Sequence, residues 1–259
     1  MSSARCYRCG GPLGSGAWLL TGEGLGEVIA QVRQKIQQGF EDEAANPKEI
    51  AKSIELLGGT LTQYQEGSRR LVLSGEYALP QLVQKLSDPT TDPMIRERII
   101  SLLPRLGPGA VRGLSVALQS DSPELQEALA MALGQIGYAH AGARLKELST
   151  REGILPRVRR AAEGALITCV GVRNAEKSVS RLFYDLALDY YNYAESLLPE
   201  QQYATANVWY WQDDIGLTFR AVPREIFCDV YAMRMSRLAL EHDKSAEPAV
   251  ALWLAANLR

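Results

Sequence analysis

The sequence predicts an all-α protein: a right-handed superhelix of stacked helix pairs, with one small β-hairpin near the C-terminus. Three observations lead to this prediction. A glycine recurs about every 30 residues, the apolar residues between these glycines follow a helical period, and only one stretch alternates as a β-hairpin does. The chain has 259 residues, 46% of them hydrophobic and 22% charged, which is the composition of an ordinary globular protein.

An internal repeat sets the predicted architecture. The stretches LSGEYALPQL (73–82), LGPGAVRGL (106–114) and IGYAHAGARL (136–145) each have an apolar residue, a glycine, a short turn and an alanine that opens a new helix. Glycine is the usual helix stop because it adopts left-handed conformations without strain. Two helices per repeat cannot bury their apolar stripes alone, so neighbouring pairs must stack. The anchoring glycines are 32, 30 and 34 residues apart: Gly75, Gly107, Gly137 and Gly171.

Each repeat is predicted to contain two helices with a polar break between them. The first helices cover 78–86, 110–119 and 141–148. We expect each second helix to begin at a proline that follows Ser or Asp, because proline suits the first helical turn and Ser or Asp caps it. The second helix of the middle repeat has the clearest apolar stripe, formed by Leu125, Ala128, Leu129, Ala132, Leu133 and Ile136.

These repeats resemble HEAT repeats, in particular the short bacterial type known from phycobilisome-lyase-like families, over about residues 62–171. The resemblance implies that the second helices line the concave face of the solenoid. Upstream, 25–36 and 50–57 form two more amphipathic helices, and 62–74 acts as the second helix of a degenerate first pair. Part of the family implies a lyase activity on bilins, but no motif here can be assigned to it. The His-Glu dipeptides that hold two irons in some HEAT enzymes do not occur in this sequence.

The C-terminal third has a different pattern. One long amphipathic helix is predicted over 181–198, ended by Pro199, and residues 226–259 look like a tetratricopeptide-type helix pair. The last helix is apolar nearly all round, so it docks back on the body, pairs with another molecule or continues in a longer chain; we expect a fragment boundary here. The predicted domains are a poorly ordered tail (1–23), HEAT-like repeats (24–174) and tetratricopeptide-like helices with the hairpin (175–259).

The hairpin is predicted at NVWYWQDDIGLTFRAVP, residues 207–223. Strand alternation places Val208 and Tyr210 on one face and two tryptophans on the other, and Gly216 supplies the turn. An isolated hairpin is marginal in water, so we expect one face to lie on the helices at 181–198 and 224–241. The other face is expected to be partly open, with an arginine stacked on a tryptophan. The candidate partner contacts are Trp209, Trp211 and Arg220.

The middle of the chain is mildly basic. The formal charge is −2 overall but +4 over residues 94–177, where arginines begin two second helices. They form either an ordinary solvated face or a site for an anionic partner; the candidate partner-binding residues are Arg96, Arg98, Arg157 and Arg160. Nucleic acid is an unlikely partner, because its binding uses more phosphate contacts than this charge provides.

Metal and catalytic sites find little support in the sequence. The CYRCGG segment (6–11) has one CxxC pair, Cys6 and Cys9, whereas a structural zinc needs four ligands. Cys169 and Cys228 fall in apolar helical positions and are expected in the core. We therefore predict no catalytic, cofactor-binding or metal-binding residue.

The function predicted is a non-enzymatic scaffold that binds another protein. The sequence has neither a signal peptide nor an apolar run long enough to span a membrane, which favours a cytoplasmic protein without membrane contact. Two alternatives remain: a HEAT-type lyase or other enzyme subunit, and a weak nucleic-acid or anion binder. A deep pocket with convergent polar groups and perturbed acids would favour the enzyme.

Overall fold

The computed structural model describes residues 26–29, 31–32, 35, 39, 43–200 and 203–259. The chain separates into two compact units, Met1–Glu43 and Ala44–Arg259, and the second contains every element discussed below. The expected tail at 1–23, with Cys6 and Cys9, lies outside the described residues. Those described between 26 and 39 are helical, in agreement with the amphipathic pattern there.

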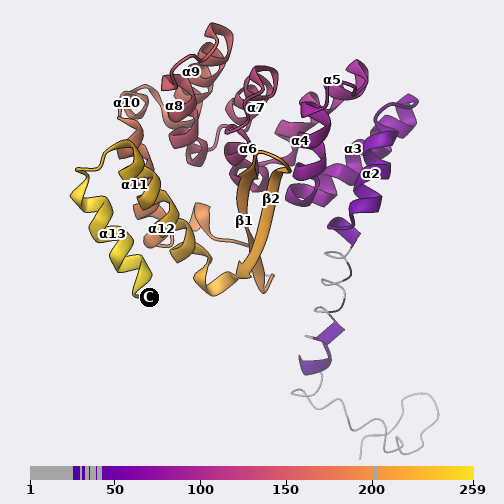
Figure 1. The fold of residues 1–259 in the computed structure, drawn as a ribbon. Helices are drawn as coiled ribbons and strands as arrows, with labels where there is room; N and C mark the ends of the chain where they lie inside the picture. The colour runs from indigo at the N-terminus through magenta and orange to yellow at the C-terminus, as the bar shows by residue number, and fades with distance from the viewer. Residues whose placement is uncertain (1–25, 30, 33–34, 36–38, 40–42, 201–202) are drawn as a thin grey trace, which may run out of the picture. The chain divides into compact units, whose positions relative to one another are not determined.

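Paired helices build most of the second unit, which confirms the all-α prediction (Figure 1). Short 3-10 turns at Gly75–Ala78, Leu103–Leu106, Pro108–Ala110 and Ala139–Ala141 connect successive pairs. The eight helices of this part are α2 (Pro47–Leu56), α3 (Leu61–Ser74), α4 (Leu79–Ser87), α5 (Pro93–Leu102), α6 (Val111–Ala117), α7 (Pro123–Ile136), α8 (Gly142–Thr150) and α9 (Pro156–Val170).

The repeat glycines hold backbone conformations that require glycine. Gly75, Gly107, Gly137 and Gly171 all have positive φ, between 55° and 77°. Only Gly137 is left-handed helical, with ψ of 24°. The other three combine positive φ with ψ near the extended region, which is open essentially to glycine alone. The glycine spacing therefore marks the repeat boundaries, as the sequence predicts.

The predicted helix starts are confirmed in two repeats of three. The side chain of Asp92 accepts from the backbone N–H of Met94 at 2.8 Å, and that of Ser122 accepts from Leu125 at 3.3 Å. In the third repeat Leu155 precedes the proline, and it has no side chain that can cap α9. The expectation of a Ser or Asp cap is wrong there.

The first helices of the repeats, not the second, face the rest of the unit. In Figure 1, α4, α6 and α8 lie on the inner side of the arc, whereas α5, α7 and α9 lie on its outer side. The strands pack on α4 and α6, and α11 packs on α8. The implied placement of the second helices on the concave face is therefore wrong, because the C-terminal third folds back onto the first helices.

The C-terminal third contains α10 (Val172–Ala175), α11 (Val179–Tyr191), β1 (Thr205–Gln212), β2 (Gly216–Pro223), α12 (Arg224–His242) and α13 (Glu247–Asn257). The predicted helix to Pro199 is wrong, because α11 ends at Tyr191. Tyr193 has φ of +54°, and the backbone N–H of Ala194 donates back to the carbonyl of Asp189 at 3.0 Å. The Tyr193 hydroxyl donates to the carboxylate of Asp229 on α12 at 3.0 Å, which anchors this turn.

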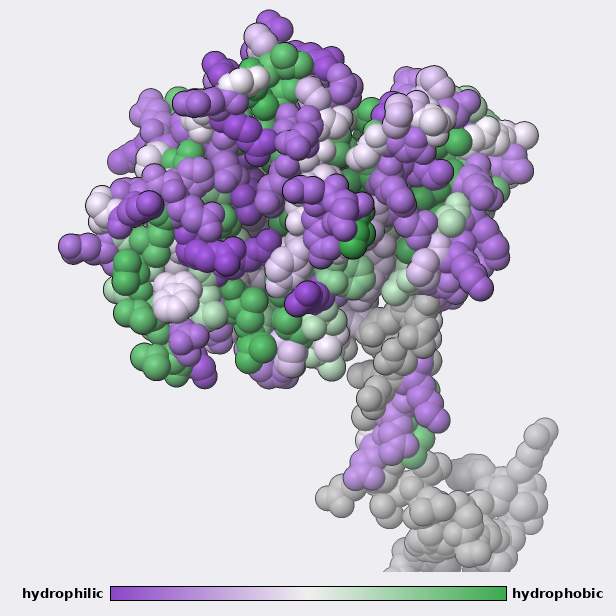
Figure 2. Space-filling model, in the orientation of Figure 1, coloured by the Kyte–Doolittle hydropathy of each residue, from purple (hydrophilic) through white to green (hydrophobic). Residues whose placement is uncertain are grey.

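The last helix docks on the body with one side only. It packs on α12 and α11, and its buried residues are Ala249, Leu252 and Ala256. Hydrophobic residues gather on the surface over α13 in Figure 2; its exposed large apolar side chains are Val250, Trp253 and Leu254, followed by Leu258. None of the described helices is both long and apolar enough to cross a membrane.

The hairpin pairs in the predicted alternation; the middle of β1 is buried, whereas Phe219, Arg220 and Ala221 of β2 are exposed. Trp209 lies opposite Phe219 and Trp211 opposite Leu217. The strands pack on α4 and α6 of the repeats as well as on α12, rather than on α11 as expected. Trp209 is fully buried: a Cβ added at Gly113 of α6 would lie 3.3 Å from its indole ring. The hairpin is a bridge between the repeats and the C-terminal helices.

Candidate functional site

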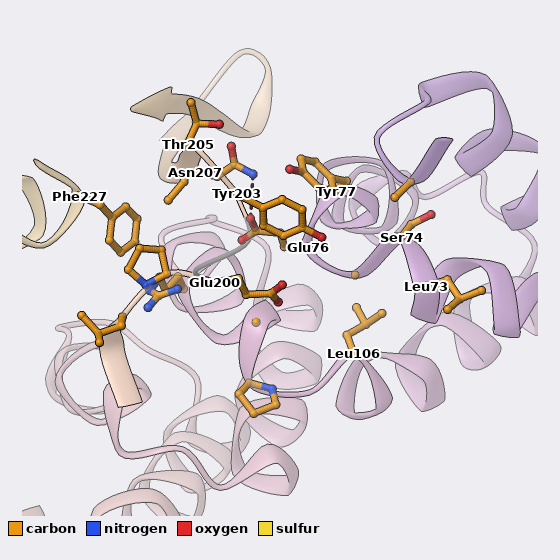
Figure 3. Close-up of a pocket in the computed structure, with 18 of the residues that line it drawn as sticks. Leu73, Ser74, Glu76, Tyr77, Leu106, Glu200, Tyr203, Thr205, Asn207 and Phe227 are labelled. Atoms are coloured by element: carbon orange, nitrogen blue, oxygen red, sulfur yellow. Dashed lines mark hydrogen bonds between the residues drawn. The ribbon is translucent and has the colours of Figure 1, made fainter. Parts of the chain in front are cut away.

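A cavity of about 530 Å³ lies at the base of the hairpin (Figure 3). Its walls come from the turn before α4, the turn before α6, the segment 196–200, the first residues of β1 and the start of α12. The repeats also contribute the end of α3, Arg112 of α6 and His140 from the turn before α8, and the remaining walls come mainly from the C-terminal third. The cavity therefore exists only because the C-terminal third folds back on the first helices.

Glu76 lies in the wall that the repeats contribute. Its carboxylate accepts from Nδ2 of Asn207 at 2.8 Å and from the indole Nε1 of Trp209 at 3.3 Å, so both strand residues hold it in place. Burial raises the pKa of Glu76, and the hydrogen bond from Asn207 and the charge of Arg112 oppose this shift. A carboxylate fixed by two donors is preorganised to meet a further donor or a cation.

Arg112, from the first turn of α6, brings a deeply set cation to the same cavity. Its Nε donates to the hydroxyl of Tyr190 at 3.1 Å and its Nη2 to the carbonyl of Leu197 at 2.6 Å. The guanidinium carbon lies 4.9 Å from the ring centroid of Phe227. All these partners are neutral, and none of the ion pairs among the described residues includes Arg112.

His140 and Ser196 complete the polar lining near Arg112. Nε2 of His140 lies 3.3 Å from the hydroxyl oxygen of Ser196. Burial and the positive charge of Arg112 lower the pKa of His140 to about 4, so the ring is neutral at pH 7. A neutral imidazole and a hydroxyl can both donate to or accept from a ligand without adding charge.

The sequence does not predict this cavity, although it does name the kind of pocket that an enzyme would need. A pocket with convergent polar groups and a perturbed acid was expected only for an enzyme, and Glu76 now fits that description. The sequence carried a weak signal: Arg112 is a charged residue within an otherwise apolar first helix. Its partners Tyr190 and Leu197 are about 80 residues away in the chain, which no local pattern reports.

The arginines predicted on α5 serve the repeats themselves. Arg96 donates to the carbonyls of Leu86 and Asp88, the latter at 2.6 Å, and so caps the end of α4. Arg98 donates to the carbonyls of Leu57 and Gly59 in the turn between α2 and α3. Both guanidiniums are thus held by internal carbonyl groups.

The arginines of α9 are at the surface. Arg157 pairs with Glu124 and also with Glu127, at 3.5 Å, on α7. Arg159 and Arg160 are exposed and form no ion pair among the described residues. The structure therefore brings Arg157 and Arg160 to one end of α9, apart from the engaged pair on α5.

The hairpin residues differ in how much surface they present. Trp209 was expected on a partly open face; this is wrong, because it is fully buried, in part against α6. Trp211 is half-buried and Arg220 is exposed. The guanidinium carbon of Arg220 lies 5.7 Å from the ring of Tyr210 and not over a tryptophan, because Arg220 pairs opposite Val208 and shares the face of Tyr210.

The two described cysteines are buried, as predicted. Neither Cys169 nor Cys228 forms a disulfide, and burial raises the pKa of both thiols, to about 11 for Cys169. Within the described part of the chain, no three His, Cys, Asp or Glu side chains converge as a metal site would need.

Comparison with known proteins identifies the repeats. Residues 79–167, about a third of the chain, match the family model of HEAT repeats. This segment runs from α4 into α9, so the resemblance seen in the sequence is confirmed for these helices. No curated protein and no solved structure is similar enough to match the chain.

Proposed function

We propose that this protein is a non-enzymatic helical-repeat scaffold that binds another protein. HEAT repeats commonly act as interaction scaffolds, and residues 79–167 match that family. The observation that carries the proposal is the open outer face of the repeats. The C-terminal third occupies the side of the first helices, and the main packing partners of α5, α7 and α9 are other repeat helices.

The chemistry of this face favours a partner with an acidic segment. At the start of α9, Arg159 and Arg160 have no ion pair within the described residues, and Arg157 is the one already balanced by glutamates. Met131 on α7 and Ile167 on α9 leave large apolar side chains exposed on the same two helices. Arginines beside apolar groups are typical of protein interfaces. Trp211 and Arg220, at the edge of the hairpin, form a second contact in this proposal.

Affinity capture from nuclease-treated cell extract tests the proposal. We expect the tagged chain to retain partners that Arg160→Glu and Arg157→Glu each release, and that elevated salt also weakens. Arg105→Glu makes the same charge change on an exposed residue after α5, at the other end of the repeat helices, and should keep them. Identical partner lists for all four proteins would rule out this surface as the interface. Loss of every partner on nuclease treatment would favour the nucleic-acid alternative.

The cavity favours a second candidate function, an enzyme subunit of the HEAT lyase type. Glu76, with its raised pKa, and the His140–Ser196 contact are the observations in its favour. Product analysis after incubation with extract metabolites, repeated with Glu76→Gln, tests it. Turnover that disappears in this variant would support the enzyme and count against a pure scaffold.

Two finer assignments belong to the same proposal. The repeats are taken as the short bacterial HEAT type, and α12 with α13 as a tetratricopeptide-like pair. The second assignment is supported by the packing of α12 on α13, which buries small residues, namely Ala232, Ala239 and Ala249. We also place the protein in the cytoplasm, in keeping with the free, buried thiols of Cys169 and Cys228. Fractionation of cells that express the tagged chain checks the location.

A further inference from the structure

We propose that the cavity at the base of the hairpin binds a small zwitterion of the amino-acid class, with its carboxylate on Arg112 and its ammonium group on Glu76. The inference is independent of the scaffold proposal, because none of the residues that line the cavity belongs to the proposed interface on the second helices or to its second contact at Trp211 and Arg220. It rests on the charges that face the cavity, on their hydrogen bonds and on the rings around them.

Arg112 is the group that calls for an anion. A charge taken out of water is costly unless it is paired, and arginine is best satisfied by a carboxylate that accepts from two of its nitrogens. Two of its nitrogens already donate to neutral oxygens, and Nη1 has no hydrogen-bond partner among the described residues. The Ser196 hydroxyl and the neutral His140 lie in the same lining and supply a further donor.

The opposite wall is acidic and calls for a cation. Glu76 uses two acceptor sites for Asn207 and Trp209, and an ionised carboxylate has about four. Figure 3 shows the side chain of Glu200 directed toward the same space as Glu76. The two carboxylates are close enough for the charge of Glu200 to act on Glu76. An ammonium group placed there would be attracted by both carboxylates.

The combination excludes ligands of a single sign. A dianion would meet Arg112 favourably but would be repelled by the two glutamates, and a diamine would face the reverse problem. A zwitterion satisfies both walls. The rings of Tyr77, Tyr203 and Phe227 line the cavity, which favours an aromatic side chain on the ligand. A cavity of about 530 Å³ suits a small ligand of this kind.

Titration calorimetry with a matched ligand series tests the proposal on the native chain. The probe is L-phenylalanine; phenylalaninamide lacks the carboxylate and N-acetylphenylalanine lacks the ammonium group. We expect saturable binding of phenylalanine and at least a tenfold weaker affinity for each blocked analogue. The dipeptide glycylphenylalanine distinguishes a free amino acid from a peptide end: equal or tighter binding would identify a peptide. No heat of binding for phenylalanine and the dipeptide, or equal affinity for the blocked analogues, would overturn the proposal.

Variants connect each end of the ligand to its wall. Glu200→Gln should weaken phenylalanine several-fold but leave N-acetylphenylalanine unchanged, because the latter has no cation for that wall to lose. Arg112→Gln should abolish the preference for phenylalanine over its amide. Arg112 also holds α11, so the fold of the Arg112→Gln protein is checked by circular dichroism. If Arg112→Gln does not fold, Glu200→Gln alone decides the test. Lys244→Gln, an exposed residue after α12, is the control. Unchanged affinity in Glu200→Gln would contradict the assigned acidic wall.

Discussion

The packing of the hairpin on α6 predicts that an alanine at position 113 destabilises the protein. A Cβ at Gly113 would lie 2.5 Å from Cδ1 of Leu79 and 3.3 and 3.4 Å from two ring atoms of Trp209. Both neighbours are fully buried, so neither side chain can swing into open space. Overpacking of this kind costs about 1–3 kcal/mol, and the better helix propensity of alanine returns up to about 1 kcal/mol.

Gly164 offers a matched control. It is an exposed glycine in α9 with no atom within 4 Å of an added Cβ. Gly164→Ala therefore receives the helix gain without the crowding and should raise the free energy of unfolding by up to about 1 kcal/mol. The difference between the two variants isolates the crowding, about 1–3 kcal/mol. Urea unfolding with unchanged m-values measures it, and a Gly113→Ala protein as stable as Gly164→Ala would refute the close contact with Trp209.

Three further predictions concern single contacts. Trp209→Phe removes the indole donor to Glu76, so it should lower the free energy of unfolding, measured in urea, by about 1–3 kcal/mol. The control is Trp253→Phe on the exposed side of α13, which should leave this free energy nearly unchanged. His140 binds a proton in the unfolded chain near its usual pKa of 6.5 but in the folded protein only near 4, so stability should fall as pH drops between these values. The upper limit is about 3 kcal/mol, reduced toward 1–2 kcal/mol because the ring is partly exposed, and thermal unfolding of His140→Gln should lack this slope. Arg98→Met should lower the free energy of unfolding by about 1–3 kcal/mol, because the carbonyls of Leu57 and Gly59 lose their donor. A change below about 0.5 kcal/mol in urea unfolding, the usual range for surface substitutions, would show that the protein does not need this contact.

The repeats were predictable because their signals are local. Glycine at each boundary, proline at each second-helix start and apolar residues at helical spacing all act within one turn of the chain. The hairpin was equally readable from its alternation. The end of α11 was not, because Tyr193 has a positive φ there and its hydroxyl donates to Asp229, 36 residues away, which no local pattern reports.

The site itself was beyond the reach of sequence patterns. Glu76 meets Asn207 and Trp209 across more than 130 residues, and the periodicity of a helix does not say which face another segment will cover. For the same reason the side of the repeats that the C-terminal third covers was predicted wrongly. Trp209 was correctly placed on the face of Trp211, but the helix that buries it lies in another part of the chain.

The central claim is that the hairpin is fastened to the first helices of the repeats, where it closes the cavity. The most direct measurement is a double-mutant cycle in urea unfolding between Glu76→Gln and Asn207→Ala, whose side chains are 2.8 Å apart. A coupling energy of about 0.5–3 kcal/mol is the result this fold predicts. Additive effects of the two substitutions would contradict it.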